Sequence, residues 1–290
     1  MNERILTKIA LIMLCGMGAC WASVCCERPA TCSGQNAEVD PVDAVLEQLN
    51  RKTLELKSYQ GQIEYGFVQV LLESESLRKG VLYYAKSDGK PTLRINFDTL
   101  KREDEKEQKY MEQYMVLDGA RLTHPDYHFK GIWLVHIDYE IEEVKYYQLA
   151  EPNDPNQPVE VFDLISRNFP MLGFTQTEDL KKQFEVTLVE PKKPTESEDF
   201  IQIHLKVKPN SIYKDDYLSI DFWVDQKLGL PVKVVAVKTE PEPPFGDICR
   251  LRFLNAKVNH RVDSKVFEFK IPKGFGEPEI IPLPEKGRRG

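Results

Sequence analysis

The body of this 290-residue sequence has almost no cysteine. Five of the six cysteines lie in the first 32 residues, and only Cys249 lies beyond them. An exported compartment would permit disulfides among Cys25, Cys26, Cys32 and Cys249, but their pairing cannot be read from spacing. The Cys26 and Cys32 pair also lacks the second ligand pair of a structural zinc site. Cysteine chemistry therefore defines neither the fold nor a site.

An excess of positive charge is also absent, since the formal net charge is −7 and the basic residues are scattered among acidic ones. The sequence therefore lacks the clustered positive charge that is typical of nucleic-acid-binding proteins. Catalytic signatures are missing too: no GxSxG, HExxH, P-loop or GxGxxG motif occurs in a fitting context. We therefore expect no enzyme, no nucleic-acid partner and no cofactor.

Only one long apolar run is present, from Ile9 to Ala19, and it follows a charged start and precedes small residues. This arrangement is typical of a secretory signal, here at residues 1–22. The apolar run is also shorter than the roughly 20 residues that a membrane-spanning helix needs. Two processing routes stay open: cleavage after Ala22, or lipidation of Cys20 in Met17–Cys20. Residues 23–39 would then form a tether, and the protein would be periplasmic or anchored to the cell envelope.

The first element of the body is a predicted helix from Pro41 to about Tyr59. Asp40 supplies an N-cap, Pro41 suits the first helical position, and apolar residues recur at helical spacing. The apolar stripe consists of Val45, Leu46, Leu49 and Leu56. Two interpretations remain open for this helix: a lid over a ligand, or a permanent wall of an ordinary core.

Strand signals fill most of the remaining chain, about ten residues apart and without βαβ alternation. We expect strands at 60–72, 77–86, 93–98, 110–117, 120–123, 130–137, 143–149, 184–189, 200–207, 218–224, 230–239 and 247–257, with a short helix at 161–169. The fold class is mainly β (α+β), an antiparallel sheet large enough to curl into an incomplete barrel. Residues 40–275 form this domain, and 276–290 form a flexible basic tail.

Histidines offer the strongest metal candidate, in His124-Pro-Asp126-Tyr-His128, but Pro-Asp beside a strand end favours a turn. We expect no metal. The apolar faces of the strands are more distinctive, because a wide barrel must enclose a ligand or take in a covering helix. The residues expected to line such a cavity are Ile63, Tyr65, Phe67, Val81, Tyr83, Leu93, Ile95, Phe97, Ile203, Leu205, Ile220, Phe222, Val232 and Val234.

An ordered series of short motifs resembles the LolA/LolB-like lipoprotein carrier superfamily. The motifs are Leu56–Tyr59, Gly80–Tyr84, Lys90–Asn96, Val116–Gly119, Phe222–Asp225, Leu230–Lys233, Val266–Phe269 and Pro272–Gly274. The resemblance implies an incomplete barrel closed by a helical lid, with a cavity for acyl chains and no covalent chemistry. Carriers of this type have an Arg before the Pro of the strand-opening motif. Here Lys90 stands in that place and Arg94 replaces the following aromatic, so both are gating candidates.

The resemblance implies a periplasmic protein, expected to be monomeric, that binds lipid acyl chains or lipid-modified proteins and meets envelope membrane partners. The same fold also serves lipoprotein acceptors and periplasmic sensors that control sigma-factor release. The alternative is therefore a regulatory or structural interaction module of the envelope in which the cavity is vestigial.

Overall fold

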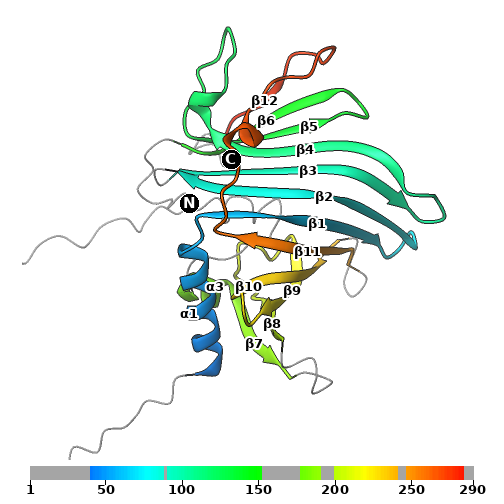
Figure 1. Ribbon diagram of the computed structural model, residues 1–290. Coiled ribbons are helices and arrows are strands. Elements are labelled where there is room, and N and C mark those ends of the chain that lie inside the picture. Colours follow the sequence, from blue (N-terminus) through cyan, green and yellow to red (C-terminus); the bar gives the residue numbers. More distant parts are fainter. Residues whose placement is uncertain (1–39, 88–89, 152–176, 191–198, 241–245, 284–290) are drawn as a thin grey trace, which may run out of the picture. The chain divides into compact units, whose positions relative to one another are not determined.

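A computed structural model describes residues 40–87, 90–151, 177–190, 199–240 and 246–283. Its main feature is a 12-stranded sheet in the order β12-β6-β5-β4-β3-β2-β1-β11-β10-β9-β8-β7 (Figure 1). The strand bounds are β1 Ser58–Gln69, β2 Ser74–Ser87, β3 Lys90–Arg102, β4 Gln108–Asp118, β5 Ile132–Asp138, β6 Glu143–Ala150, β7 Phe184–Val189, β8 Phe200–Val207, β9 Tyr217–Asp225, β10 Leu230–Lys238, β11 Ile248–Val258 and β12 Glu279–Ile281.

The described part of the chain confirms the mainly β class and most of the predicted strands. Neighbouring strands pair antiparallel, apart from the parallel pair β12 and β6. The predictions at 184–189 and 200–207 match β7 and β8 residue for residue. The strand order is linear and the two edges, β12 and β7, do not pair with each other, so the sheet is open.

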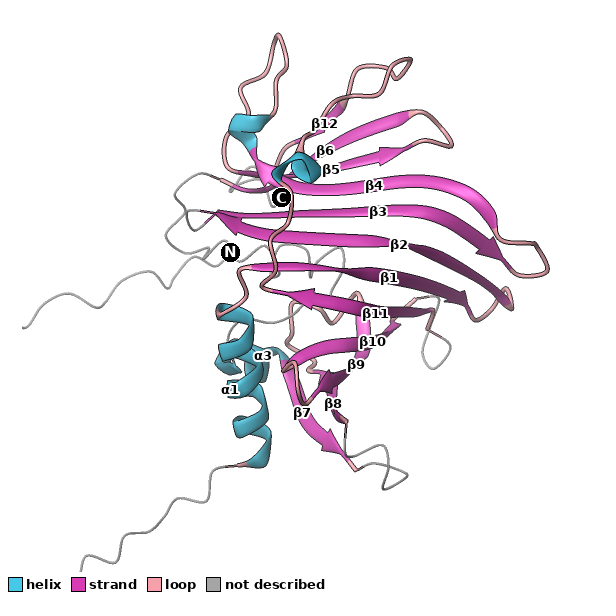
Figure 2. Cartoon of the chain, viewed as in Figure 1, coloured by secondary structure: helices cyan, strands magenta, loops and turns pink. Residues whose placement is uncertain are grey.

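Among the described residues helices are few (Figure 2). The helix α1 spans Pro41–Leu54, and Asp40 Oδ1 caps it by accepting a hydrogen bond from Val42 N at 3.0 Å. The second described helix, α3, spans Thr177–Gln183 and was not predicted. In the described residues, no helix is long and apolar enough to cross a membrane.

Three local predictions were wrong. The helix α1 ends at Leu54 rather than near Tyr59, because Ser58 and Tyr59 already pair in β1 with β2 and β11. Residues 120–123 form no strand: Gly119–Arg121 is a 3₁₀ helix, capped by Asp118. Glu279–Ile281, placed in the flexible tail, form β12 against β6. The helix predicted at 161–169 lies outside the described residues.

Two cores lie on opposite faces of the sheet. The main core covers one face from β4 and β5 through β1 to β7, and α1 and α3 contribute Leu46 and Leu180 to it. The second core lies on the other face of β4, β5 and β6, around Trp133 and Tyr146. The segment after β4 and the C-terminal segment cover this second face with Phe129, Phe269 and other side chains. Period-two alternation therefore serves two separate cores in these three strands.

Candidate functional site

The main-core face of the sheet is the candidate site, because it holds most of the residues expected to bind a ligand. Eleven of the fourteen lie in or against the main core: Ile63, Tyr65, Phe67, Leu93, Ile95, Phe97, Ile203, Leu205, Ile220, Phe222 and Val234. Their placement follows the register, since directly paired residues share a face of an antiparallel sheet. This places them on one surface of the sheet.

Val81 and Tyr83 were assigned to this face incorrectly. Val81 pairs with the exposed Gln62, and the main-core residues of β2 are Leu82 and Tyr84. The sequence motif contains apolar residues at consecutive positions of β2, so alternation could not decide which pair faces inward.

Val232 lies outside both cores. It is the extra residue at a β-bulge, between the pairs Pro231 with Val224 and Lys233 with Trp223. Val232 is half-buried, and the ladder shifts by one residue at this bulge.

The four residues expected on the lid also reach the main core. Leu46 and Leu56 are buried in it, and Val45 and Leu49 pack against it half-buried. Leu56 lies beyond the end of α1, in the connection to β1. The helix packs chiefly on α3, β7 and β10. It therefore covers the end of the sheet formed by the later strands.

Arg94, one of the two gating candidates, lies on the opposite face. Its Nη1 donates to the carbonyl oxygens of Val266 at 2.7 Å and Glu268 at 3.2 Å, and its Nη2 donates to Gln113 Oε1 at 3.0 Å. Arg94 thereby holds the C-terminal segment against β3 and β4. Lys90, the other candidate, is the first residue of β3.

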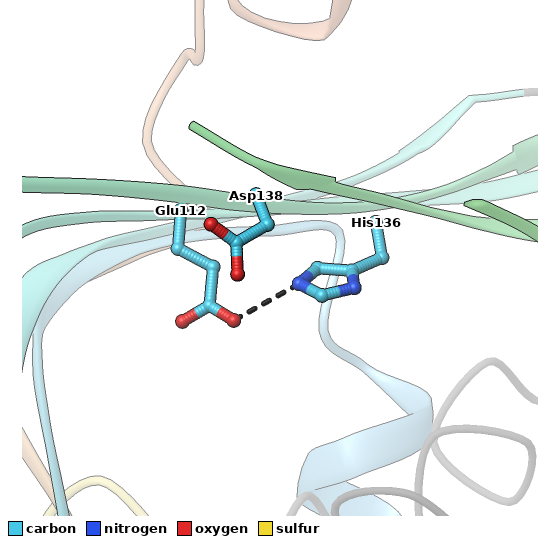
Figure 3. Close-up of side chains that lie close together, drawn as sticks. All are labelled: Glu112, His136 and Asp138. Carbon is cyan, nitrogen blue, oxygen red and sulfur yellow. Dashed lines mark hydrogen bonds and ion pairs between the residues drawn. The ribbon is translucent and has the colours of Figure 1, made fainter. Parts of the chain in front are cut away.

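A polar cluster interrupts the main-core face across β2, β3, β4 and β5, which follow one another in the sheet. Glu112 of β4 is only 4% exposed and accepts a hydrogen bond from Tyr114 Oη at 2.6 Å. His136 Nε2 of β5 lies 2.9 Å from the same carboxylate oxygen (Figure 3). Arg78 Nε of β2 forms an ion pair with the other oxygen at 3.2 Å, outside ideal hydrogen-bond geometry. Asp138 completes the cluster, two residues after His136 and paired with Glu112 across β4 and β5.

These contacts keep Glu112 ionised. Burial alone would raise the pKa of its carboxyl group, but the hydrogen bonds from His136 and Tyr114 and the charge of Arg78 outweigh burial and lower the pKa below its ordinary value. The guanidinium of Arg78 also lies over the rings of Tyr65 and Tyr110, at 5.8 and 5.6 Å from their centroids. A buried charge is therefore held by several partners on an otherwise apolar face.

This cluster was not predicted from the sequence. The only signal was His136 and Asp138 at i and i+2, which places both on one face of a strand. Glu112 is 24 residues away and Arg78 further still. The group comes together only because β4 pairs with β5 and with β3, and β3 with β2.

The remaining sequence candidates lie elsewhere. Asp126 N donates to His124 Nδ1 at 3.1 Å in a turn, which confirms the turn interpretation of that motif. Cys249 is a buried free thiol whose Sγ lies 3.7 Å from Tyr65 Oη, and burial raises its pKa. Cys20, Cys25, Cys26 and Cys32 lie outside the described residues.

No protein-family model and no curated protein sequence matches the chain. Solved structures do match. A DUF1329 family protein from Desulfovibrio piger is 12% identical with a TM-score of 0.39, over 79% of this chain and 98% of that one. A putative outer membrane lipoprotein-sorting protein domain from Vibrio parahaemolyticus is 11% identical with a TM-score of 0.38, over 78% and 97%.

MucB is 12% identical with a TM-score of 0.43, over 79% of this chain and 62% of that one, and the MucA/MucB complex of Pseudomonas aeruginosa also matches. The lipoprotein-sorting class that the sequence resembles is thus among the structural matches. At identities of 11–12% and these TM-scores, the likeness by itself assigns neither a family nor a function to this chain.

Proposed function

We propose that this chain is an exported protein of the cell envelope that binds acyl chains, of lipids or of lipid-modified proteins, on the main-core face of its sheet. The observation that carries the proposal is the distribution of apolar surface. In the order of the sheet, the main core runs from β5 through β4, β3, β2, β1 and β11 as far as β7 at the edge. The helix α1, by contrast, packs chiefly on α3, β7 and β10, and α3 packs on β7. Among the described residues, neither helix makes extensive contact with the apolar face of β2 to β5.

An acyl chain suits such a face on energetic grounds. Each CH₂ group removed from water contributes about 0.8 kcal/mol, so a long acyl chain offers roughly 10 kcal/mol before the cost of ordering it. Contacts between apolar groups have no directional requirement. An acyl chain can therefore lie against the main-core face and replace existing apolar contacts with similar ones. The signal predicted at residues 1–22 supports the proposal, because an exported protein would meet such ligands.

A second function is an interaction module of the envelope whose main core is filled and takes no ligand. The burial of the central strands favours this alternative, because Leu93 and Ile95 are 1% exposed and Val116 is 0% exposed. A filled core and a ligand-binding face differ in how they respond to added bulk.

The test uses the full chain, exported by the host and purified from its envelope fraction under mild conditions. Native mass spectrometry should detect bound acyl lipid, and protein stripped of lipid should take it up from phospholipid vesicles. A folded protein that carries none and acquires none would contradict the proposal.

A matched pair of variants separates the two functions. Ile63 faces the main core at 2% exposure, and its neighbour Gln62 is exposed on the other face. Ile63→Trp should reduce lipid uptake by occupying ligand space with little loss of stability, and Gln62→Trp should change neither. If Ile63→Trp instead destabilises the fold by about 1–3 kcal/mol and lipid is absent throughout, the face is a filled core.

A further inference from the structure

The polar cluster contains three side chains of types that ligate divalent metal ions. Glu112, His136 and Asp138 each offer one ligand atom, and these atoms all lie within 4.8 Å of one another. Figure 3 shows the three side chains on one side of β4 and β5, converging on a common point. The described residues hold no other such group.

Backbone pairing fixes this convergence. His136 and Asp138 are two residues apart on β5 and therefore share a face, and Glu112 is the direct partner of Asp138 on β4. Ligands on neighbouring strands are held by the sheet itself, so little chain entropy is lost when a metal binds.

Each ligand is also oriented by a second interaction. The ring of His136 stacks on Tyr114 with centroids 4.4 Å apart and an interplanar angle of 8°. Tyr114 Oη donates to Glu112 Oε1 at 2.6 Å. Asp138 Oδ1 accepts from the backbone of Glu140 at 2.8 Å and of Ile141 at 3.4 Å, which leaves Oδ2 for a ligand. Outer contacts of this kind position the ligands of metal sites.

We propose that Glu112, His136 and Asp138 form a site for a divalent transition metal, with Zn²⁺ as the best-matched ion. One imidazole nitrogen and two carboxylate oxygens suit zinc, and three protein ligands leave the fourth position for water. Tetrahedral zinc with bonds of roughly 2.0–2.2 Å places its ligand atoms roughly 3.3–3.6 Å apart. The three ligand atoms of this cluster already lie within 4.8 Å of one another, close to that spacing.

Arg78 sets the strength of the site. Its Nε lies 3.2 Å from Glu112 Oε2, so Oε1 is the oxygen that faces His136 and the metal. Two carboxylates and one guanidinium give the group a net charge of −1 while His136 is neutral, which favours a cation. The guanidinium also repels the metal, so its removal should tighten binding.

The experiment titrates metal-free full-length protein with Zn²⁺ by calorimetry and with Co²⁺ by absorption spectroscopy. Co²⁺ should give ligand-field bands without thiolate charge-transfer bands, which distinguishes this site from cysteine ligation in the N-terminal region. His136→Gln and Asp138→Asn should each weaken Zn²⁺ binding by about tenfold or more. Asp138→Asn keeps Oδ1 as an acceptor for the turn, so it tests the site with the least risk to folding.

The chain offers a matched control in His204 of β8, whose Nδ1 lies 3.1 Å from Asp221 Oδ1 of β9. This pair is also a histidine with a carboxylate on a neighbouring strand, but it belongs to no three-ligand group in the described residues. His204→Gln should leave Zn²⁺ affinity unchanged, and Arg78→Gln should raise it. The proposal is overturned if wild-type protein binds no Zn²⁺, if Asp138→Asn and His136→Gln bind like the wild type, or if Arg78→Gln binds more weakly.

Discussion

At the scale of single residues, Tyr59 shows how an unpaired polar atom affects stability. The residue is 8% exposed, its hydroxyl finds no hydrogen-bond partner among the described residues, and burial raises its pKa to about 12. Tyr59→Phe should leave the free energy of unfolding unchanged or raise it, because a buried unsatisfied hydroxyl costs about 1–3 kcal/mol.

The same residue gives a pH dependence. The pKa of Tyr59 is about 12 in the folded protein and near 10.0 in the unfolded chain. The stability that this difference contributes is therefore fully present below pH 10 and is lost as the pH rises toward 12. The free energy of unfolding, measured with urea, should therefore fall more steeply with pH over this range for wild type than for Tyr59→Phe. A control is Tyr114→Phe, which removes a real hydrogen bond to Glu112 and should destabilise the protein at neutral pH. Equal slopes in wild type and Tyr59→Phe would contradict the assignment.

At the scale of elements, one glycine permits the pairing of β2 with β3. A Cβ on Gly80 would lie 1.9 Å from the carbonyl oxygen of Asn96, at the point where the register of the two strands shifts. Backbone atoms cannot yield as a flexible side chain can, so Gly80→Ala should separate the strands locally and cost about 2 kcal/mol or more.

The control for this substitution is Gly66→Ala in β1. The nearest atom to an added Cβ there is Arg250 Cβ at 3.6 Å, an ordinary contact. Thermal unfolding should show a large loss for Gly80→Ala and a small change for Gly66→Ala. Similar losses of stability for both variants would show that the contact between a Cβ at Gly80 and the Asn96 carbonyl oxygen is not what destabilises the protein.

The helix α1 allows the lid and wall interpretations to be compared. Leu46 is 4% exposed and Leu49 is half-buried. Leu46→Ala should cost the 2–5 kcal/mol that is typical of a buried leucine, and Leu49→Ala should cost less. If α1 is a lid, Leu49→Ala should also shift lipid affinity, measured with the vesicle uptake assay. A full cost at both positions without any effect on lipid would make the helix a permanent wall.

At the scale of the whole molecule, the main core links strands from β4 and β5 to β7 through one connected set of contacts. We expect the described sheet to unfold in a single transition. Trp133 lies in the second core and Trp223 on β9, so variants that each retain one of these two reporters monitor different regions. Phe222→Asp buries a charge at a position that is 4% exposed. It should lower the free energy of unfolding by several kcal/mol and shift the midpoints seen by both reporters together. Two separated midpoints would show that the sheet unfolds in independent parts.

The sequence by itself determined most of the strands and the start of α1. Alternation and turn residues located β7 and β8 with the bounds observed, and the Asp40-Pro41 signal located the start of α1. Both features depend on neighbours along the chain. It did not determine which of two adjacent apolar pairs in β2 faces the main core, nor that Arg94 holds the C-terminal segment.

Those outcomes depend on strand register, which hydrogen bonds between distant segments decide. The polar cluster has the same origin. Glu112 meets His136, Asp138 and Arg78 only because β4 pairs with β5 and with β3, and β3 with β2. Tertiary structure alone therefore placed a charged group on an apolar face, since no local pattern records which residues of three strands will lie together.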